Sequence, residues 1–184
     1  MSEYYLISQL PSLDGISDNM PIPITEERFL ELCDRFLGKK AQREMKNLKA
    51  IPSRDAEKTG SALIDAWNDG ERDLRLALCK IRAGKMKKTF ETENRSLPIE
   101  LVKVAGAAAE MESPMEAERF LFTHRMAFLE SLRPMDTFSE DFVYYYGLKL
   151  KLILRMRQFD TKLGETAYRN IYNSILNGDK VEAI

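Results

Sequence analysis

Apolar residues recur along this chain at three- and four-residue steps, the spacing that places them on one face of an α-helix. The pattern predicts helices over about 26–37, 39–50, 56–85, 98–109, 114–132 and 140–159, followed by a final helix that ends at Gly178. Only the run from Tyr4 to Pro11 is ambiguous, because it is too short for periodicity to separate a strand from a helical turn. The sequence therefore predicts an all-α helical bundle of about six to seven helices, with a short extended or irregular N-terminal segment.

Residues that favour helix starts support these boundaries. Thr25, Ser113 and Ser139 each stand where a side-chain oxygen can accept a free backbone N–H of the first turn. Ser113 also opens the sequence Ser-Pro-Met-Glu, a capping box with proline at the first helical position. Within the third predicted helix, Gly70 follows Trp67 by three residues. Glycine weakens a helix interior, so we expect a bend or a close helix approach at Gly70, and Trp67 packed against another helix.

The helix predicted over 140–159 is the most apolar in the chain. Its stripe comprises Phe142, Tyr145, Leu148, Leu152, Met156 and Phe159, and it is widened beyond half the circumference by Tyr146, Leu150, Ile153 and Leu154. A helix this apolar must be covered on two sides, so we expect it to be the most buried helix of the fold. The run Tyr144–Tyr146 points in three directions around the helix, and at least one ring is expected to face outward.

Composition adds no strong charge bias to this picture. The 184 residues are 44% hydrophobic and 31% charged, with a net charge of −1. This balance indicates a folded protein without an overall field toward nucleic acid or an anionic membrane. Residues 1–184 are expected to form a single helical domain, with 1–90 and 91–184 as candidate sub-lobes. Cys33 and Cys79 lie far apart and no signal peptide is recognisable, which favours a reducing, cytoplasmic setting.

The pattern of reactive residues is not typical of an enzyme. The two cysteines and the single histidine, His124, lack metal-ligand spacing, and the sequence has no glycine-rich loop ending in Lys-Ser or Lys-Thr. His124 lies beside Phe122 and Phe128, which favours a packed or surface histidine over a catalytic base. The acid pairs Glu26–Glu27 and Glu140–Asp141 follow helix caps, where acids stabilise the helix dipole. We therefore expect a non-catalytic protein without metal, nucleotide or other cofactor.

The most strongly charged stretch runs from Lys80 to Lys88. It holds five basic residues and no acidic one. One interpretation is a solvated helix end whose cations complement the negative end of the helix dipole. The other is a docking patch for an acidic partner surface. Nucleic acid is the weaker form of this second interpretation, because aromatic residues are not interleaved with the charges.

Four segments, in their order along the chain, resemble a bacterial family of unknown function encoded alongside the subunits of V-type (A/V-type) ATPases. They are Tyr4–Pro11; Trp67–Arg75 with Arg82–Lys85; Glu118–Arg119 with Phe128–Glu130; and Phe138–Ser139 with Leu148–Leu150, Arg155, Phe159–Asp160 and Gly164. The likeness is strongest at the two ends and patchy between Pro11 and Leu63. The chain is shorter than many members of the family, and Thr123–His124 stands near a position where the family often has an acid.

The resemblance implies a non-catalytic subunit or accessory protein of a V-type ATPase. Such a subunit would be similar to the C/d-type component of the central stalk. That component is a helical socket that couples the stalk to the membrane ring in ion transport. The implied partners are ATPase subunits of the central stalk and the proteolipid ring. The chain would then reach the cytoplasmic face of the membrane only through the complex. The alternative is an independent helical adaptor or nucleic-acid-associated protein, for which only the basic stretch provides support.

Cations on two helices are the candidate partner contacts under this hypothesis. Lys149, Lys151 and Arg155 lie on the long apolar helix, and Lys85, Lys87 and Lys88 lie at the end of an earlier one. They flank the segments that carry the resemblance. An acidic partner surface would attract them more strongly at low than at high ionic strength.

Overall fold

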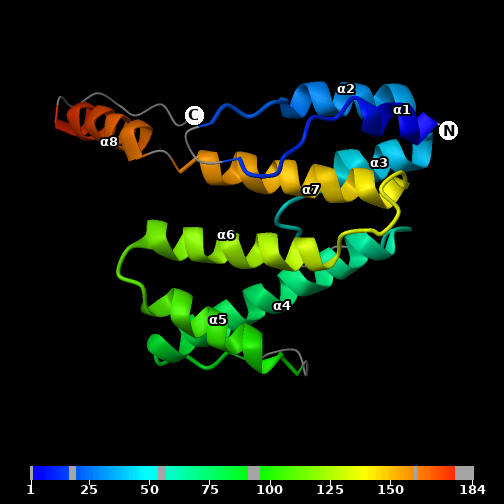
Figure 1. The fold of residues 1–184 in the computed structure, drawn as a ribbon. Coiled ribbons are helices and arrows are strands. Elements are labelled where there is room, and N and C mark those ends of the chain that lie inside the picture. Colours follow the sequence, from blue (N-terminus) through cyan, green and yellow to red (C-terminus); the bar gives the residue numbers. More distant parts are fainter. Residues whose placement is uncertain (1, 17–19, 54–56, 91–95, 160, 177–184) are drawn as a thin grey trace.

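The computed structural model describes residues 2–16, 20–53, 57–90, 96–159 and 161–176. Within these ranges the chain forms eight α-helices and no strand, which confirms the all-α class (Figure 1). They are α1 (Ser2–Ser8), α2 (Glu26–Phe36), α3 (Lys39–Asn47), α4 (Ala62–Lys85), α5 (Ile99–Glu110), α6 (Pro114–Ser131), α7 (Glu140–Arg157) and α8 (Thr161–Leu176).

The N-terminal segment, expected to be extended or irregular, is instead the short helix α1. Its Leu6 is fully buried in the core, while Tyr4 remains exposed and rests on the ring of Phe138 at 5.0 Å between centroids. The turn is continued by the backbone bond from Leu10 N–H to Ile7 O at 3.1 Å. Tertiary packing thus decides a segment for which local sequence is ambiguous.

Side-chain caps set the starts of α2, α6 and α7 as predicted. Thr25 accepts from the backbone N–H of Arg28 at 3.2 Å, and Ser139 accepts from that of Phe142 at 3.3 Å. At the start of α6 the Ser113 hydroxyl accepts from the Glu116 N–H at 3.4 Å. These contacts satisfy backbone donors that have no partner inside the helix.

The start of α4 differs from the prediction. Ala56, where the helix was expected to begin, lies outside the described residues, and the described residues from 57 to 61 are not helical. The helix begins after Ser61, whose hydroxyl accepts from the Ile64 N–H at 3.3 Å and donates to Asp141 at 2.6 Å. This cap therefore also ties α4 to the first turn of α7.

Helix α7 forms the centre of the molecule. It packs against α1, α2, α3, α4 and α6, and every residue from 143 to 150 is buried (Figure 1). This confirms the prediction that it is the most buried helix. Gly147 permits close packing, because a Cβ there would lie 3.0 Å from the sulfur of Met45 and 3.1 Å from the ring of Phe29.

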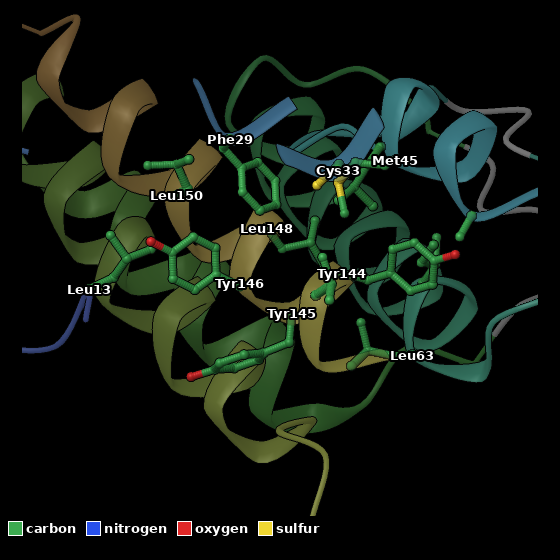
Figure 2. Packing of buried hydrophobic residues seen from close by; sticks show 14 of the residues in the cluster. Leu13, Phe29, Cys33, Met45, Leu63, Tyr144, Tyr145, Tyr146, Leu148 and Leu150 are labelled. Atoms are coloured by element: carbon green, nitrogen blue, oxygen red, sulfur yellow. The ribbon is translucent and has the colours of Figure 1, made fainter. Parts of the chain in front are cut away.

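The tyrosines of α7 are not placed as predicted. Tyr144, Tyr145 and Tyr146 are 3%, 3% and 5% exposed, so no ring of the three faces outward. Tyr145 donates to Glu130 at 2.6 Å, and Tyr146 donates to the carbonyl of Pro11 at 2.8 Å. A buried tyrosine needs such a partner, and these bonds let the rings join the core shown in Figure 2.

Two hydrophobic clusters form the core. The larger is built on α1, α2, α3, α7 and the adjoining ends of α4 and α6. The smaller comprises Leu74, Ala77, Leu78, Ala105, Ala108 and Leu121, from the second half of α4, α5 and the first half of α6. Helices α4 and α6 contribute to both clusters, so each cluster combines residues from before and after position 90.

Gly70 marks a close approach between α4 and α6. A Cβ at this position would lie 2.4 Å from the ring of Phe128, and α4 is helical without interruption from Ala62 to Lys85. Trp67 is fully buried and stacks on the same ring at 5.8 Å between centroids. The prediction of a close helix approach and a packed tryptophan is confirmed. None of the described helices is long and apolar enough to cross a membrane.

Candidate interaction surfaces

Lys149, one of the predicted contact cations, lies inside the fold. Its ammonium donates to Asp14 and to Glu130, each at 2.6 Å, and to the hydroxyl of Tyr145 at 3.3 Å, and only 7% of its side chain is exposed. Burial alone would lower the pKa of Lys149, but the hydrogen bonds to Asp14 and Glu130 outweigh it and raise the pKa above its ordinary value.

The same contacts act on the two carboxylates. The hydrogen bond from Lys149 lowers the pKa of Asp14 below its ordinary value. For Glu130, burial works in the opposite direction, but the bonds from Lys149 and Tyr145 prevail and lower its pKa as well. Lys149 therefore joins the loop at Asp14 and the end of α6 to α7, which is a role inside the fold. Sequence spacing gave no signal for it, because Asp14 is 135 residues away.

The other two predicted contact cations of α7 lie nearer the surface, and each contacts a neighbouring helix. Lys151 forms an ion pair with Glu26 at the start of α2. Arg155 lies 3.6 Å from a carboxylate oxygen of Glu118 on α6, and its guanidinium sits over the ring of Phe159. A third of the Arg155 side chain remains exposed, so part of it faces solvent.

The cations at the end of α4 are differently placed. Lys85, Lys87 and Lys88 are all exposed, and Lys85 reaches the carbonyl of Ala109 at the end of α5. The structure thus separates the predicted contact residues into an α7 group paired with carboxylates and an exposed α4 group.

Helix α8 presents an apolar face that the fold leaves open. Its residues Tyr168, Ile171, Tyr172 and Ile175, here called the α8 apolar face, are between 52% and 68% exposed. The rings of Tyr168 and Tyr172 stack at 6.1 Å between centroids. In Figure 1 α8 lies beyond the end of α7, and it makes no extensive packing with another described helix. The pattern predicted this one-sided helix, whereas Gly178, its expected end, lies outside the described residues.

A buried ion pair that the sequence did not predict joins α4 to α6. The Arg125 guanidinium donates through Nε and Nη2 to the two carboxylate oxygens of Glu71, each at 2.9 Å. Only 7% of the Arg125 side chain and 1% of the Glu71 side chain are exposed. Along both helices the pair lies between residues of the two hydrophobic clusters, so it links these clusters. Its two-pronged geometry is that of a structural pair.

No group of three or more His, Cys, Asp or Glu side chains among the described residues converges as a metal site would require. Burial raises the pKa of the Cys33 thiol to about 12, which disfavours the reactive thiolate. Burial, and then the charge of Arg125, lowers the pKa of His124, which lies half-buried on α6.

A cavity of about 490 Å³ lies beside α3 and the start of α4. Its wall is mixed, with carboxylates, amides and lysines but no buried cluster of one charge; among its residues are Glu44, Asn47, Lys49, Ser53, Lys58, Thr59 and Asn68. Such a wall does not define a ligand class. Surfaces, more than cavities, are therefore the candidate sites of this molecule.

Comparison of the chain with protein-family models, with curated proteins and with solved structures finds no match.

Proposed function

We propose that this protein is a non-catalytic helical subunit that acts by binding other proteins. The observation that carries the proposal is the α8 apolar face. Its members stand at positions i, i+3, i+4 and i+7, the spacing by which a helix inserts into an apolar groove of a partner. A lone helix of 16 residues is marginally stable in water, so burial of this face in a partner would also stabilise α8.

For the partner we propose the central stalk of a V-type (A/V-type) ATPase, in which the chain would take a place like that of the C/d-type component. The support for this assembly is the resemblance of four sequence segments. A packed helical frame suits a part that transmits force, and it requires no reacting group. The chain would work at the cytoplasmic face of the membrane in ion transport, held there by the ATPase subunits.

The test is co-purification of the tagged full chain from detergent-solubilised membranes of cells that contain it, with mass-spectrometric identification of ATPase subunits. We expect stalk subunits to co-purify with the wild-type chain. Ile171→Lys places a charge in the middle of the α8 apolar face and should abolish the association. Asn170→Lys adds the same charge to the opposite face of α8 and should leave it intact.

Each alternative has a distinct outcome. If the wild-type chain recovers no ATPase subunit, the assignment to this assembly is wrong. If Ile171→Lys recovers the subunits as well as the wild type does, the contact lies elsewhere, and charge reversal of Lys151 and Arg155 is the next variant to measure. If Ile171→Lys converts a self-associated chain to a monomer in light scattering, the occupant of the α8 apolar face is a second copy.

A further inference from the structure

We propose that the turn at the end of α4 docks directly onto an anionic lipid surface. This turn, residues 85–90, is called the α4 tip below. The proposal is independent of the V-type ATPase assignment, in which the membrane is reached only through other subunits. It rests on the exposure of the cations, on the apolar side chains between them and on the backbone conformation of one lysine.

The first observation is a dense and accessible positive charge. Lys85, Lys87 and Lys88 of the tip are exposed, as are Lys80 and Arg82 in the preceding part of α4, and Lys85 also reaches the backbone carbonyl of Ala109. No acidic residue interrupts the sequence from 80 to 90. The whole chain has a net charge of −1, so this concentration is local. Clusters of four or more lysines and arginines are attracted to anionic leaflets, by roughly 1 kcal/mol for each cation near the surface.

The second observation is apolar surface among these cations. Met86, between Lys85 and Lys87, is 61% exposed. Phe90, two residues after Lys88, is 37% exposed and also lines a cavity with Leu76 and Cys79 of α4. A solvated helix end would have no need of such side chains. A bilayer interface accepts both parts, because apolar side chains enter the boundary of the acyl chains while lysines stay at the level of the headgroups.

The third observation concerns the backbone at Lys87. Its φ is 53°, in the left-handed region, where glycine is the usual residue. The N–H groups of Lys87 and Lys88 bond to the carbonyls of Gly84 at 3.1 Å and Ala83 at 2.9 Å, the pattern of a Schellman motif with Lys87 at the position that glycine normally takes. A lysine at this position costs conformational energy relative to glycine, yet the α4 tip has a lysine there.

These features favour lipid over the other anionic partners. A single-stranded nucleic acid is held by several aromatic rings along a groove, whereas the α4 tip has one phenylalanine, Phe90. A protein partner would need a surface shaped to this turn. A fluid bilayer imposes no such shape and accepts a charged apolar turn directly.

Flotation of the full chain with vesicles tests the proposal. We expect it to bind vesicles of phosphatidylcholine containing one third phosphatidylglycerol, and not vesicles of phosphatidylcholine alone. Raising the salt from about 50 to about 500 mM NaCl should release it. Reversal of two charges in Lys87→Glu/Lys88→Glu should weaken binding by more than about 25-fold, since each lost cation accounts for about fivefold.

Two further variants separate a local contact from a change in total charge or in folding. Lys39→Glu/Lys40→Glu makes the same change in net charge at exposed lysines at the start of α3, and vesicle binding should persist. Lys87→Gly removes one cation while relieving the positive φ. It should bind about fivefold more weakly and melt at the same or a higher temperature.

The contrary outcomes are equally clear. Equal binding to both kinds of vesicle, or binding that survives reversal at the tip, would overturn the proposal. Binding of poly(U) RNA in place of vesicles would identify the tip as a nucleic-acid surface and would also overturn it. So would absent vesicle binding together with tip-dependent recovery of ATPase subunits in detergent, because the tip would then be a protein contact.

Discussion

Helices α7 and α8 follow one another at the C-terminal side of the chain, yet they meet opposite surroundings. They are 18 and 16 residues long, and each carries aromatic and branched side chains at helical spacing. In α7 every residue from 143 to 150 is buried, whereas the α8 apolar face is more than half exposed. A periodic pattern thus measures how much apolar surface must be covered, but not what covers it. For α7 the cover is the chain itself, and for α8 we propose a partner.

Matched truncations at the two helices sharpen this comparison most. Leu152 of α7 is 1% exposed, so Leu152→Ala should lower the free energy of unfolding by about 2–5 kcal/mol through lost burial and a cavity. Ile171→Ala in α8 truncates a side chain that is already 53% exposed and should change the free energy of unfolding by no more than about 0.5 kcal/mol. Urea denaturation of the purified chain measures both. Equal losses would mean that α8 is packed in the free protein.

Lys149 offers a second test of how α7 is integrated into the fold, because its ammonium is buried and paired with two carboxylates. In Lys149→Met the carboxylates of Asp14 and Glu130 lose their shared cation. Their side chains are 66% and 41% exposed, so water compensates in part, and we expect a loss of about 1–3 kcal/mol at neutral pH. Lys151→Met removes a single ion pair, with Glu26, from a lysine whose side chain is more exposed than that of Lys149, and it should cost less than about 1 kcal/mol.

The dependence of this loss on pH follows from the pKa shifts. The pKa values of Asp14 and Glu130 are lowered by folding, so their contribution is present above the ordinary values of 3.8 and 4.5 and is lost as the pH falls through the folded values. The pKa of Lys149 is raised, so its contribution holds below its ordinary 10.5 and is lost at higher pH. Wild type and Lys149→Met should therefore differ most between these limits and converge in acid. A constant difference down to about pH 2 would contradict the ion-pair explanation.

The features that could be predicted from the sequence are those that depend on residues close together in the chain. The caps at Thr25, Ser113 and Ser139 and the burial of α7 were predictable, because they depend on neighbours in sequence. Local signals did not reveal the helical state of α1, which packing of Leu6 decides.

Long-range pairing was also beyond prediction. Lys149 was expected at a contact surface, but its carboxylate partners come from a loop and a helix distant in sequence. The same holds for Arg125 and Glu71, which lie 54 residues apart. A charged residue within an apolar stripe was the available signal for Lys149, since such a residue is either at the edge of the stripe or paired.

The glycines of the two helices provide a third comparison. Gly147→Val would place its side chain against Met45 and Phe29, where even a Cβ lies 3.0–3.1 Å from the nearest atoms. Overpacking of this kind should cost about 1–3 kcal/mol, visible as a lower melting temperature. An unchanged melting temperature would show that α2 and α3 can move away from α7 freely. Close packing around α7 would then contribute less to stability than the burial of α7 indicates.

Gly164 in α8 should respond in the opposite direction and by the smallest amount. Apart from its chain neighbours and the nearby backbone of α8, no atom lies within 4 Å of a Cβ built there, so Gly164→Ala meets no obstacle and gains helix propensity of up to about 1 kcal/mol. Because α8 packs little against the other described helices, this gain should stabilise α8 locally and leave the main unfolding transition unchanged. Hydrogen exchange distinguishes local stabilisation of α8 from stabilisation of the whole fold. We expect α8 amides to exchange up to about fivefold more slowly and α7 amides to be unaffected. Slower exchange in both helices would show that α8 folds as one unit with the bundle, and its apolar face would then no longer be a separate element awaiting a partner.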